Sequence, residues 1–151
     1  MPKPLISISL LALCCSACAP THDAAPITVI LHDQRFTAEL ATHAAAREHG
    51  LMMRTSLAAD RGMLFVFPDT APRGFWMKNT LIPLDILYFD ADRKLVSVQP
   101  GVPPCKADPC SIYPSAGPAR YVLELPAGTA RRIGVRDGDT LAIGGEMGSV
   151  D

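Results

Sequence analysis

RGMLFVFPDTAPRGFWMKNTLIPLDILYFD, residues Arg61 to Asp90, is the stretch that decides the fold. Most of it is apolar and rich in residues that favour strands, but charged and amide side chains interrupt it. From Leu84 to Phe89 the side chains alternate between two faces, since side chains along a strand have a period of two. This alternation places Asp85 on the same face as Leu87 and Phe89, among apolar neighbours.

Asp85 therefore needs a partner. An ionised carboxylate among apolar groups must find a cation or several hydrogen-bond donors, or become neutral through a raised pKa. We predict that Asp85 pairs with a cation from Lys78, Arg54 or Arg61. Two interpretations stay open: the pair is structural, or it lies at the edge of a concave site beside Trp76.

The segment 75–80 is a second polar interruption. Asn79 and Thr80 suit a tight turn that hydrogen-bonds its own backbone, which is the simpler interpretation. The alternative is a polar cleft floored by Trp76 and Met77. No catalytic residue can be identified from these patterns, and the ligand-binding candidates are Arg54, Trp76, Lys78, Asn79, Asp85 and Glu124.

The flanking sequence predicts further short elements. A hairpin turn is expected at 32–34, and a short helix over 44–48 with Thr42 as N-cap and Gly50 as its end. One helical turn is expected over 128–133, ending at Gly134. Alternation and Gly/Pro punctuation predict strands at 27–31, 35–41, 62–67, 74–78, 84–89, 94–100, 119–125 and 140–143.

These elements favour an α+β, predominantly β fold. We expect a compact barrel-like or sandwich-like single domain, mostly antiparallel, with one short helix after the first hairpin. The Gly138-Asp139 pair is expected to turn the chain into the closing strand.

Several motifs together resemble the domain of unknown function 192 family over residues 27–143. The resemblance implies a small, mostly β domain, often exported in bacteria, with no established activity, no cofactor and no catalytic residues to carry over. The motifs are Gly50-Leu51-Met52 with Arg54, Gly62-Met63-Leu64-Phe65, Phe75-Trp76-Met77-Lys78-Asn79-Thr80, Pro83-Leu84-Asp85-Ile86, and Tyr121-Val122-Leu123-Glu124-Leu125 with Gly138-Asp139.

The segment 103–110 departs from the family pattern and contains two cysteines, Cys105 and Cys110. In an oxidising compartment this close pair is expected to form a disulfide, worth about 2 kcal/mol in the chain-entropy model. A metal or redox pair is the alternative, but the segment has no histidines nearby and no C-x-x-C spacing.

The first residues have the pattern of an export signal. Lys3 supplies the short positive end, and residues 5–13 form an apolar run too short to span a bilayer. Ser16 and Ala17 precede Cys18, which suits cleavage before that cysteine and its acylation. Ordinary cleavage near Ala19 is the alternative. We expect residues 1–17 to be a signal peptide, 18–26 a lipidated tether, 27–145 a single domain and 146–151 a C-terminal tail.

This reading predicts an exported, lipid-anchored protein of the cell envelope that faces the periplasm, at the outer membrane where the cell has one. The membrane is then a partner through the lipid on Cys18. Nucleic acid is not expected, because the chain has 14 basic and 15 acidic residues and no sustained basic face. No metal site is expected either: the histidines lack ligand spacing, and methionines in apolar stretches are usually core residues rather than Cu(I) ligands.

Two functions remain open. The first, which we favour over an enzyme, is a binding or accessory module with a small polar cleft, whose ligand in the envelope is a small molecule, a glycan or a protein. The second is an envelope hydrolase that acts on glycan or peptide through Asp85 and Glu124, provided that the fold brings both carboxyl groups into one pocket. Glu124 falls on the polar side of 121–125, so we expect it to be exposed.

Overall fold

The structure is a computed structural model that describes residues 25–151. The expected signal peptide, Cys18 and most of the expected tether lie outside the described residues. Within residues 25–151, no helix is long and apolar enough to cross a membrane.

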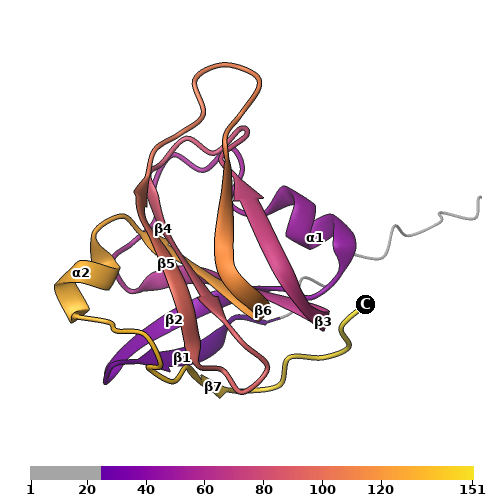
Figure 1. Ribbon diagram of the computed structural model, residues 1–151, viewed down its shortest axis with the longest axis vertical. Helices are drawn as coiled ribbons and strands as arrows, with labels where there is room; N and C mark the ends of the chain where they lie inside the picture. The colour runs from indigo at the N-terminus through magenta and orange to yellow at the C-terminus, as the bar shows by residue number, and fades with distance from the viewer. Residues whose placement is uncertain (1–24) are drawn as a thin grey trace, which may run out of the picture.

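A single seven-stranded sheet forms the domain, in the order β5-β4-β6-β3-β2-β1-β7 (Figure 1). Every strand pairing is antiparallel except that of β2 with β3. The strands are β1 (Ile27–Leu31), β2 (Gln34–Ala41), β3 (Arg61–Trp76), β4 (Leu84–Phe89), β5 (Leu95–Val102), β6 (Ile112–Pro126) and β7 (Ala142–Gly144).

The sheet curls so that its two ends approach each other. Lys94 and Thr140 form an isolated bridge, and the amide of Leu95 donates to the carbonyl of Asp139 at 2.8 Å. These contacts join the start of β5 and the residue before it to the segment that precedes β7. The predicted β-rich, mostly antiparallel, barrel-like single domain is confirmed.

Strand β3 is longer than the sequence pattern predicts. The expected strands 62–67 and 74–78 are one strand that ends at Trp76, and its register against β6 shifts between Val66 and Ala71 and again between Pro72 and Gly74. The prolines in this stretch suggest a break, but irregular pairing accommodates them inside the strand. Strand β6 is extended in the same way and begins at Ile112 rather than near 119.

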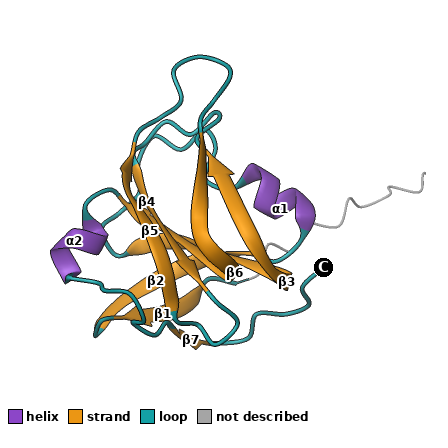
Figure 2. Ribbon diagram, in the orientation of Figure 1, coloured by secondary structure: helices purple, strands orange, loops and turns teal. Residues whose placement is uncertain are grey.

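Two helices flank the sheet, α1 (Ala44–His49) after β2 and α2 (Thr129–Ile133) after β6 (Figure 2). Helix α1 ends at Gly50 as predicted, but its N-cap is not Thr42. The ring Nδ1 of His43 accepts from the amide of Ala46 at 3.3 Å. An imidazole nitrogen thus takes the role that we expected of a hydroxyl.

Apolar side chains fill both faces of the sheet. One cluster includes Leu87, Phe89 and Leu123, and the other includes Ile86, Tyr88 and Val122. The predicted alternation along β4 is therefore confirmed, and all six of its residues are buried.

The expected disulfide between Cys105 and Cys110 is present, with its Cα atoms 5.6 Å apart. It closes the loop between β5 and β6, which projects at the top of Figure 1.

Candidate functional site

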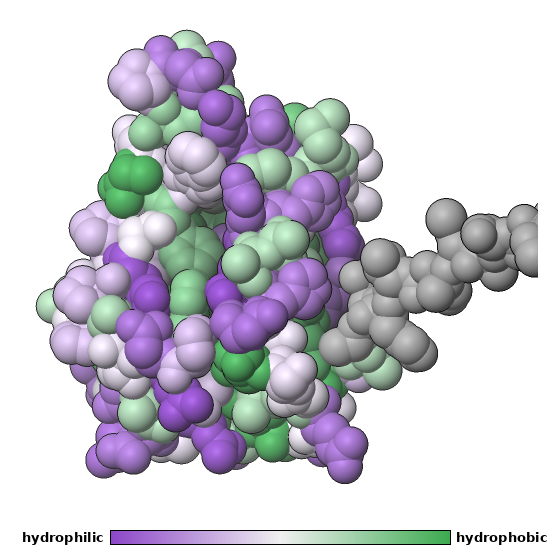
Figure 3. Space-filling model, turned by 90° about the vertical axis from the view of Figure 1, so that its right-hand side faces the viewer, coloured by the Kyte–Doolittle hydropathy of each residue, from purple (hydrophilic) through white to green (hydrophobic). Residues whose placement is uncertain are grey.

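A groove of about 410 Å³ lies between α1 and the end of β3. Trp76, the last residue of β3 and the only tryptophan of the chain, lines it with 43% of its surface exposed. Figure 3 looks onto the α1 side of the molecule, where apolar atoms lie in a hollow rimmed by hydrophilic residues. The groove is lined by Ala45, Glu48, His49, Met52, Trp76, Lys78 and Asn79.

A second, narrow cavity of about 30 Å³ lies beside the groove and reaches Glu124. The two hollows share Glu48, His49, Met52 and Trp76 as lining residues. The volume of the inner cavity suits one water-sized group.

Glu124 is buried at the centre of the sheet, with 4% of its surface exposed. It lies on β6 opposite Met63 of β3 and Ile86 of β4, and faces the same apolar cluster as these residues. The expectation that Glu124 is exposed is therefore wrong. The predicted alternation of side chains between the two faces of β6 is correct. The face that carries Glu124 is not exposed to solvent, because α1 and the aromatic end of β3 cover it and line the cavity there.

The carboxyl group of Glu124 has no protein partner within the described chain: no side chain or backbone group hydrogen-bonds it there, and burial alone raises its pKa to about 8. Burial also raises the pKa of the neighbouring Tyr88 hydroxyl, and the charge of Glu124 adds to this effect. The Tyr88 hydroxyl donates instead to the carbonyl of Tyr113 at 2.6 Å. Glu124 is thus a mainly protonated acid at neutral pH whose hydrogen-bonding capacity is unused.

Lys78 and Asn79 are brought to the mouth of the groove by a tight turn. The amide of Thr80 donates to the carbonyl of Met77 at 3.2 Å, and Asn79 has a φ of 55°, a left-handed conformation that asparagine tolerates. The predicted turn is confirmed. The ammonium of Lys78 lies 5.5 Å from the centroid of the Trp76 ring and 3.9 Å from the Asp108 carboxylate.

Among residues 25–151 no cation pairs with Asp85, so the predicted pairing with Lys78, Arg54 or Arg61 is wrong. Its Oδ1 accepts from the amides of Gly101 at 2.7 Å and Gly128 at 3.0 Å, and its Oδ2 accepts from the amide of Ala130 at 2.7 Å. Asp85 is fully buried. Three backbone donors replace the cation, which is the other way to satisfy a buried carboxylate.

Asp85 and Glu124 cannot share a pocket. Asp85 is paired with Leu125 of β6 and faces the Leu87 side of the sheet, whereas Glu124 is paired with Ile86 and faces the opposite side. A pair of working carboxyl groups needs a common space, so the arrangement required for hydrolysis through these two residues is absent.

Arg54 and Met77 also lie away from the groove. The Nη1 and Nη2 atoms of Arg54 both donate to the carboxylate of Glu39 on β2, Nη1 at 2.6 Å. This pairing with Glu39 raises the pKa of Arg54. Met77 is 1% exposed and belongs to the core, so it is not a floor of the cleft. Of the predicted candidates, the structure thus brings together Trp76, Lys78, Asn79 and Glu124.

Sequence reasoning missed the α1 wall of the groove, formed by Ala45, Glu48 and His49, with Met52 from the turn that follows the helix. Among residues 25–151 no group of three or more His, Cys, Asp or Glu side chains could hold a metal ion, so His49 is not part of such a group. Nothing in the local pattern of α1 shows that it packs beside the far end of β3, so this wall carries no usable sequence signal.

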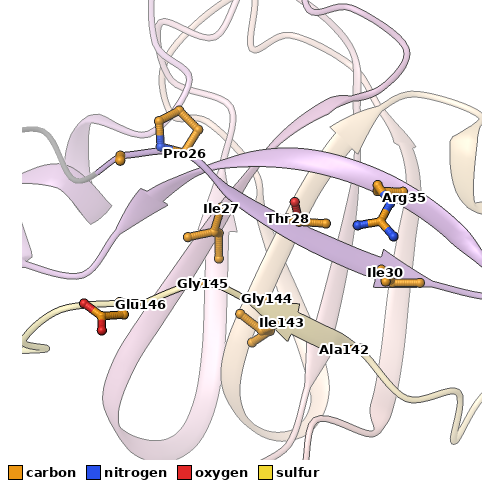
Figure 4. A pocket seen from close by; sticks show the side chains of 11 residues that line it. Pro26, Ile27, Thr28, Ile30, Arg35, Ala142, Ile143, Gly144, Gly145 and Glu146 are labelled. Carbon is orange, nitrogen blue, oxygen red and sulfur yellow. The ribbon is translucent and has the colours of Figure 1, made fainter.

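A larger depression of about 810 Å³ lies along the other end of the sheet, between β1 and β7 (Figure 4). Its lining comes from β1, from β7 and from Arg35 of β2, with Glu146 at one side. It contains none of the predicted candidates and no buried unpartnered acid. We therefore place the candidate site at the groove, which is smaller but chemically better equipped.

Fold and groove together define a small, curled β-sheet domain with an open hollow on one side. The family DUF192, described as "Uncharacterized ACR, COG1430", matches residues 27–143. The chain belongs to this family. No curated protein matches it.

Two crystal structures are similar to this chain. A candidate transcription regulator of Sinorhizobium meliloti 1021 is 40% identical, with a TM-score of 0.68 over 78% of this chain and 92% of the other. A protein of unknown function from Novosphingobium aromaticivorans DSM 12444 is 36% identical, with a TM-score of 0.65 over 78% of this chain and 83% of the other.

Proposed function

We propose that this protein is an envelope-anchored binding module whose ligand occupies the groove between α1 and Trp76. One observation carries the proposal: an exposed tryptophan lines both the groove and the adjoining cavity, which reaches a buried carboxyl group without a partner among residues 25–151. Buried polar groups are normally satisfied, so a ligand or a water molecule is the natural partner of Glu124.

The anchoring half of the proposal is supported by the sequence. A short apolar run precedes Ser16, Ala17 and Cys18, and a lipid on Cys18 would hold the domain at the membrane surface. A disulfide between Cys105 and Cys110 is consistent with an oxidising compartment.

We do not propose hydrolysis through Asp85 and Glu124, because the sheet separates them. A role in DNA binding, suggested by the description of the Sinorhizobium relative, is also disfavoured. The chain has almost equal numbers of basic and acidic residues, whereas DNA binding requires clustered Lys and Arg side chains that neutralise phosphates.

Amide chemical-shift mapping tests the binding proposal. The isotope-labelled chain, as processed by the cell, is titrated with a mixed set of small neutral, acidic and basic compounds. At least one class should shift the signals of Glu48, His49, Trp76 and Asn79 in a saturable way. The variant Trp76→Ala should weaken this response, and Glu146→Gln, an exposed change in the β1/β7 depression, should leave it unchanged.

The proposal fails if the shifts fall on β1 and β7 instead, or if no compound class shifts the groove signals at concentrations where weak fragment binding is routinely seen.

A further inference from the structure

We propose that the ligand of the groove is an uncharged saccharide, which stacks on Trp76 and directs one carbonyl oxygen, such as that of an N-acetyl group, into the cavity toward Glu124. This inference rests on the proposed binding function and names its ligand class. It is drawn from the charge of the groove, the exposed ring and the unpartnered acid.

The charges around the groove nearly cancel. Lys78 contributes one positive charge, but the Asp108 carboxylate lies 3.9 Å from its ammonium, and Glu48 adds a negative charge on the facing helix. Among the described residues that line the groove, an anionic ligand would find one lysine or arginine, Lys78, which already pairs with Asp108. A cationic ligand would meet Lys78 beside the aromatic ring that it needs for a cation–π contact.

The ring and its polar neighbours fit a hydroxyl-rich ligand. Trp76 offers a flat apolar surface for the C–H face of a sugar, and aromatic residues supply much contact area at little entropic cost. Lys78, Asn79 and Glu48 surround it with donors and acceptors that can orient hydroxyl groups. A wholly apolar ligand would leave these groups, and Glu124 above all, without partners.

The inner cavity explains why the ligand should be neutral. At neutral pH Glu124 is a protonated acid, so it can donate a hydrogen bond to an oxygen that enters the cavity. The titratable groups around it are Tyr88 on β4 and Arg47, Glu48 and His49 on α1, whereas its neighbours on β3 are apolar. Arg47 is already engaged by the carbonyls of Thr42 and Val66.

The test uses the fluorescence of Trp76, which reports on the groove alone because the chain has no other tryptophan. The full chain, as processed by the cell, is purified in a detergent without a sugar headgroup. It is titrated with three trimers of matched size: neutral N-acetylglucosamine, cationic glucosamine and anionic galacturonic acid. At about pH 6.5 the neutral trimer should give a saturable change and bind at least about tenfold more tightly than either charged trimer.

A pH series then tests the role of Glu124. The affinity for the neutral trimer should fall at least about tenfold between about pH 6.5 and pH 9.5, because ionised Glu124 can no longer donate. Glu124→Gln keeps a hydrogen-bond donor at every pH and retains His49 and Tyr88. Its affinity for the neutral trimer should therefore change less than about threefold across the same pH range. Glu146→Gln should behave as the wild type. The pH dependence of the wild type is measured without any variant, so it still tests the proposal if Glu124→Gln fails to fold.

The inference is overturned if a charged trimer binds more tightly than the neutral one, or if wild-type affinity does not fall with pH. It is also overturned if no trimer binds while other small compounds shift the groove signals, in which case the binding function stands. If no compound of any kind binds at the groove, both the saccharide proposal and the proposed binding function fail.

Discussion

Asp85 and Glu124 lie on adjacent strands and are both buried, but their carboxyl groups differ in the hydrogen bonds that they receive. Asp85 receives three backbone hydrogen bonds, whereas Glu124 receives none within the described chain. The first arrangement holds loops together, because the donors come from β5 and from the start of α2. The second leaves an acid whose capacity is free for a ligand. Burial alone therefore does not distinguish a structural carboxyl group from a functional one.

We predict that Asp85→Asn lowers the free energy of unfolding by about 2 to 4 kcal/mol, because the amide group cannot accept at both positions and at least one backbone donor loses its partner. Urea unfolding measures the change, with Asp60→Asn as an exposed control. Groove binding by the folded fraction should be unchanged, since Asp85 faces the other side of the sheet. Unaltered stability would show that these three hydrogen bonds contribute little.

Glu124 should make stability depend on pH. Its pKa is about 8 in the folded chain, against an ordinary value of 4.5, so the folded state holds the proton more tightly. The stabilisation from protonated Glu124 is complete below about pH 4.5 and is lost as pH rises toward 8, with a slope of up to about 1.4 kcal/mol per pH unit. The difference between wild type and Glu124→Gln, measured by denaturant unfolding across this range, isolates the effect. A constant difference would contradict it.

At the scale of elements, strand β3 connects the core to the site. Its first half pairs with both β2 and β6, and its far end packs the half-buried Phe75 against the core and places Trp76 in the groove. Phe75 packs edge-on against Phe65, with ring centroids 4.9 Å apart. This contact fixes the end of the strand, and so the position of Trp76.

Close packing between β3 and β6 gives the next prediction. A Cβ at Gly62 would lie 2.6 Å from the carbonyl oxygen of Glu124, so the two strands would have to separate. We expect Gly62→Ala to cost about 1 to 3 kcal/mol. Thermal unfolding should show a clear loss relative to Gly117→Ala on β6, where the added Cβ meets only a Val96 methyl at 3.3 Å. Equal melting temperatures for the two variants would argue against the close approach.

Alternation predicted β1 and β4 correctly because each is a short strand with a regular apolar pattern. It divided β3 because prolines interrupt the pattern there, although a bulged strand tolerates them. Trp76, Lys78 and Asn79 could be grouped from the sequence since they are neighbours along the chain. The burial of Glu124 and the α1 wall could not be predicted, because both depend on packing between distant segments.

At the scale of the whole molecule, the sequence before the domain has the pattern expected of a lipoprotein signal. We predict that the mature protein begins at an acylated Cys18, since two small residues precede it and Pro20 disfavours cleavage at the next site. Mass spectrometry of the mature N-terminus tests this, with Cys18→Ser expected to abolish acylation. An unmodified chain that starts at Pro20 or beyond would show that the protein is exported without a lipid.

The central claim is that the cavity beside the groove reaches a protonated acid that no group among residues 25–151 satisfies. The most direct measurement is a carboxyl-carbon NMR titration of Glu124 in the free protein, with Glu124→Gln used to assign the signal. We predict a midpoint near pH 8, because burial without a partner disfavours the charged form. A midpoint at or below the ordinary value of 4.5 would mean that Glu124 is already ionised and satisfied by the protein, and would contradict the account of the site.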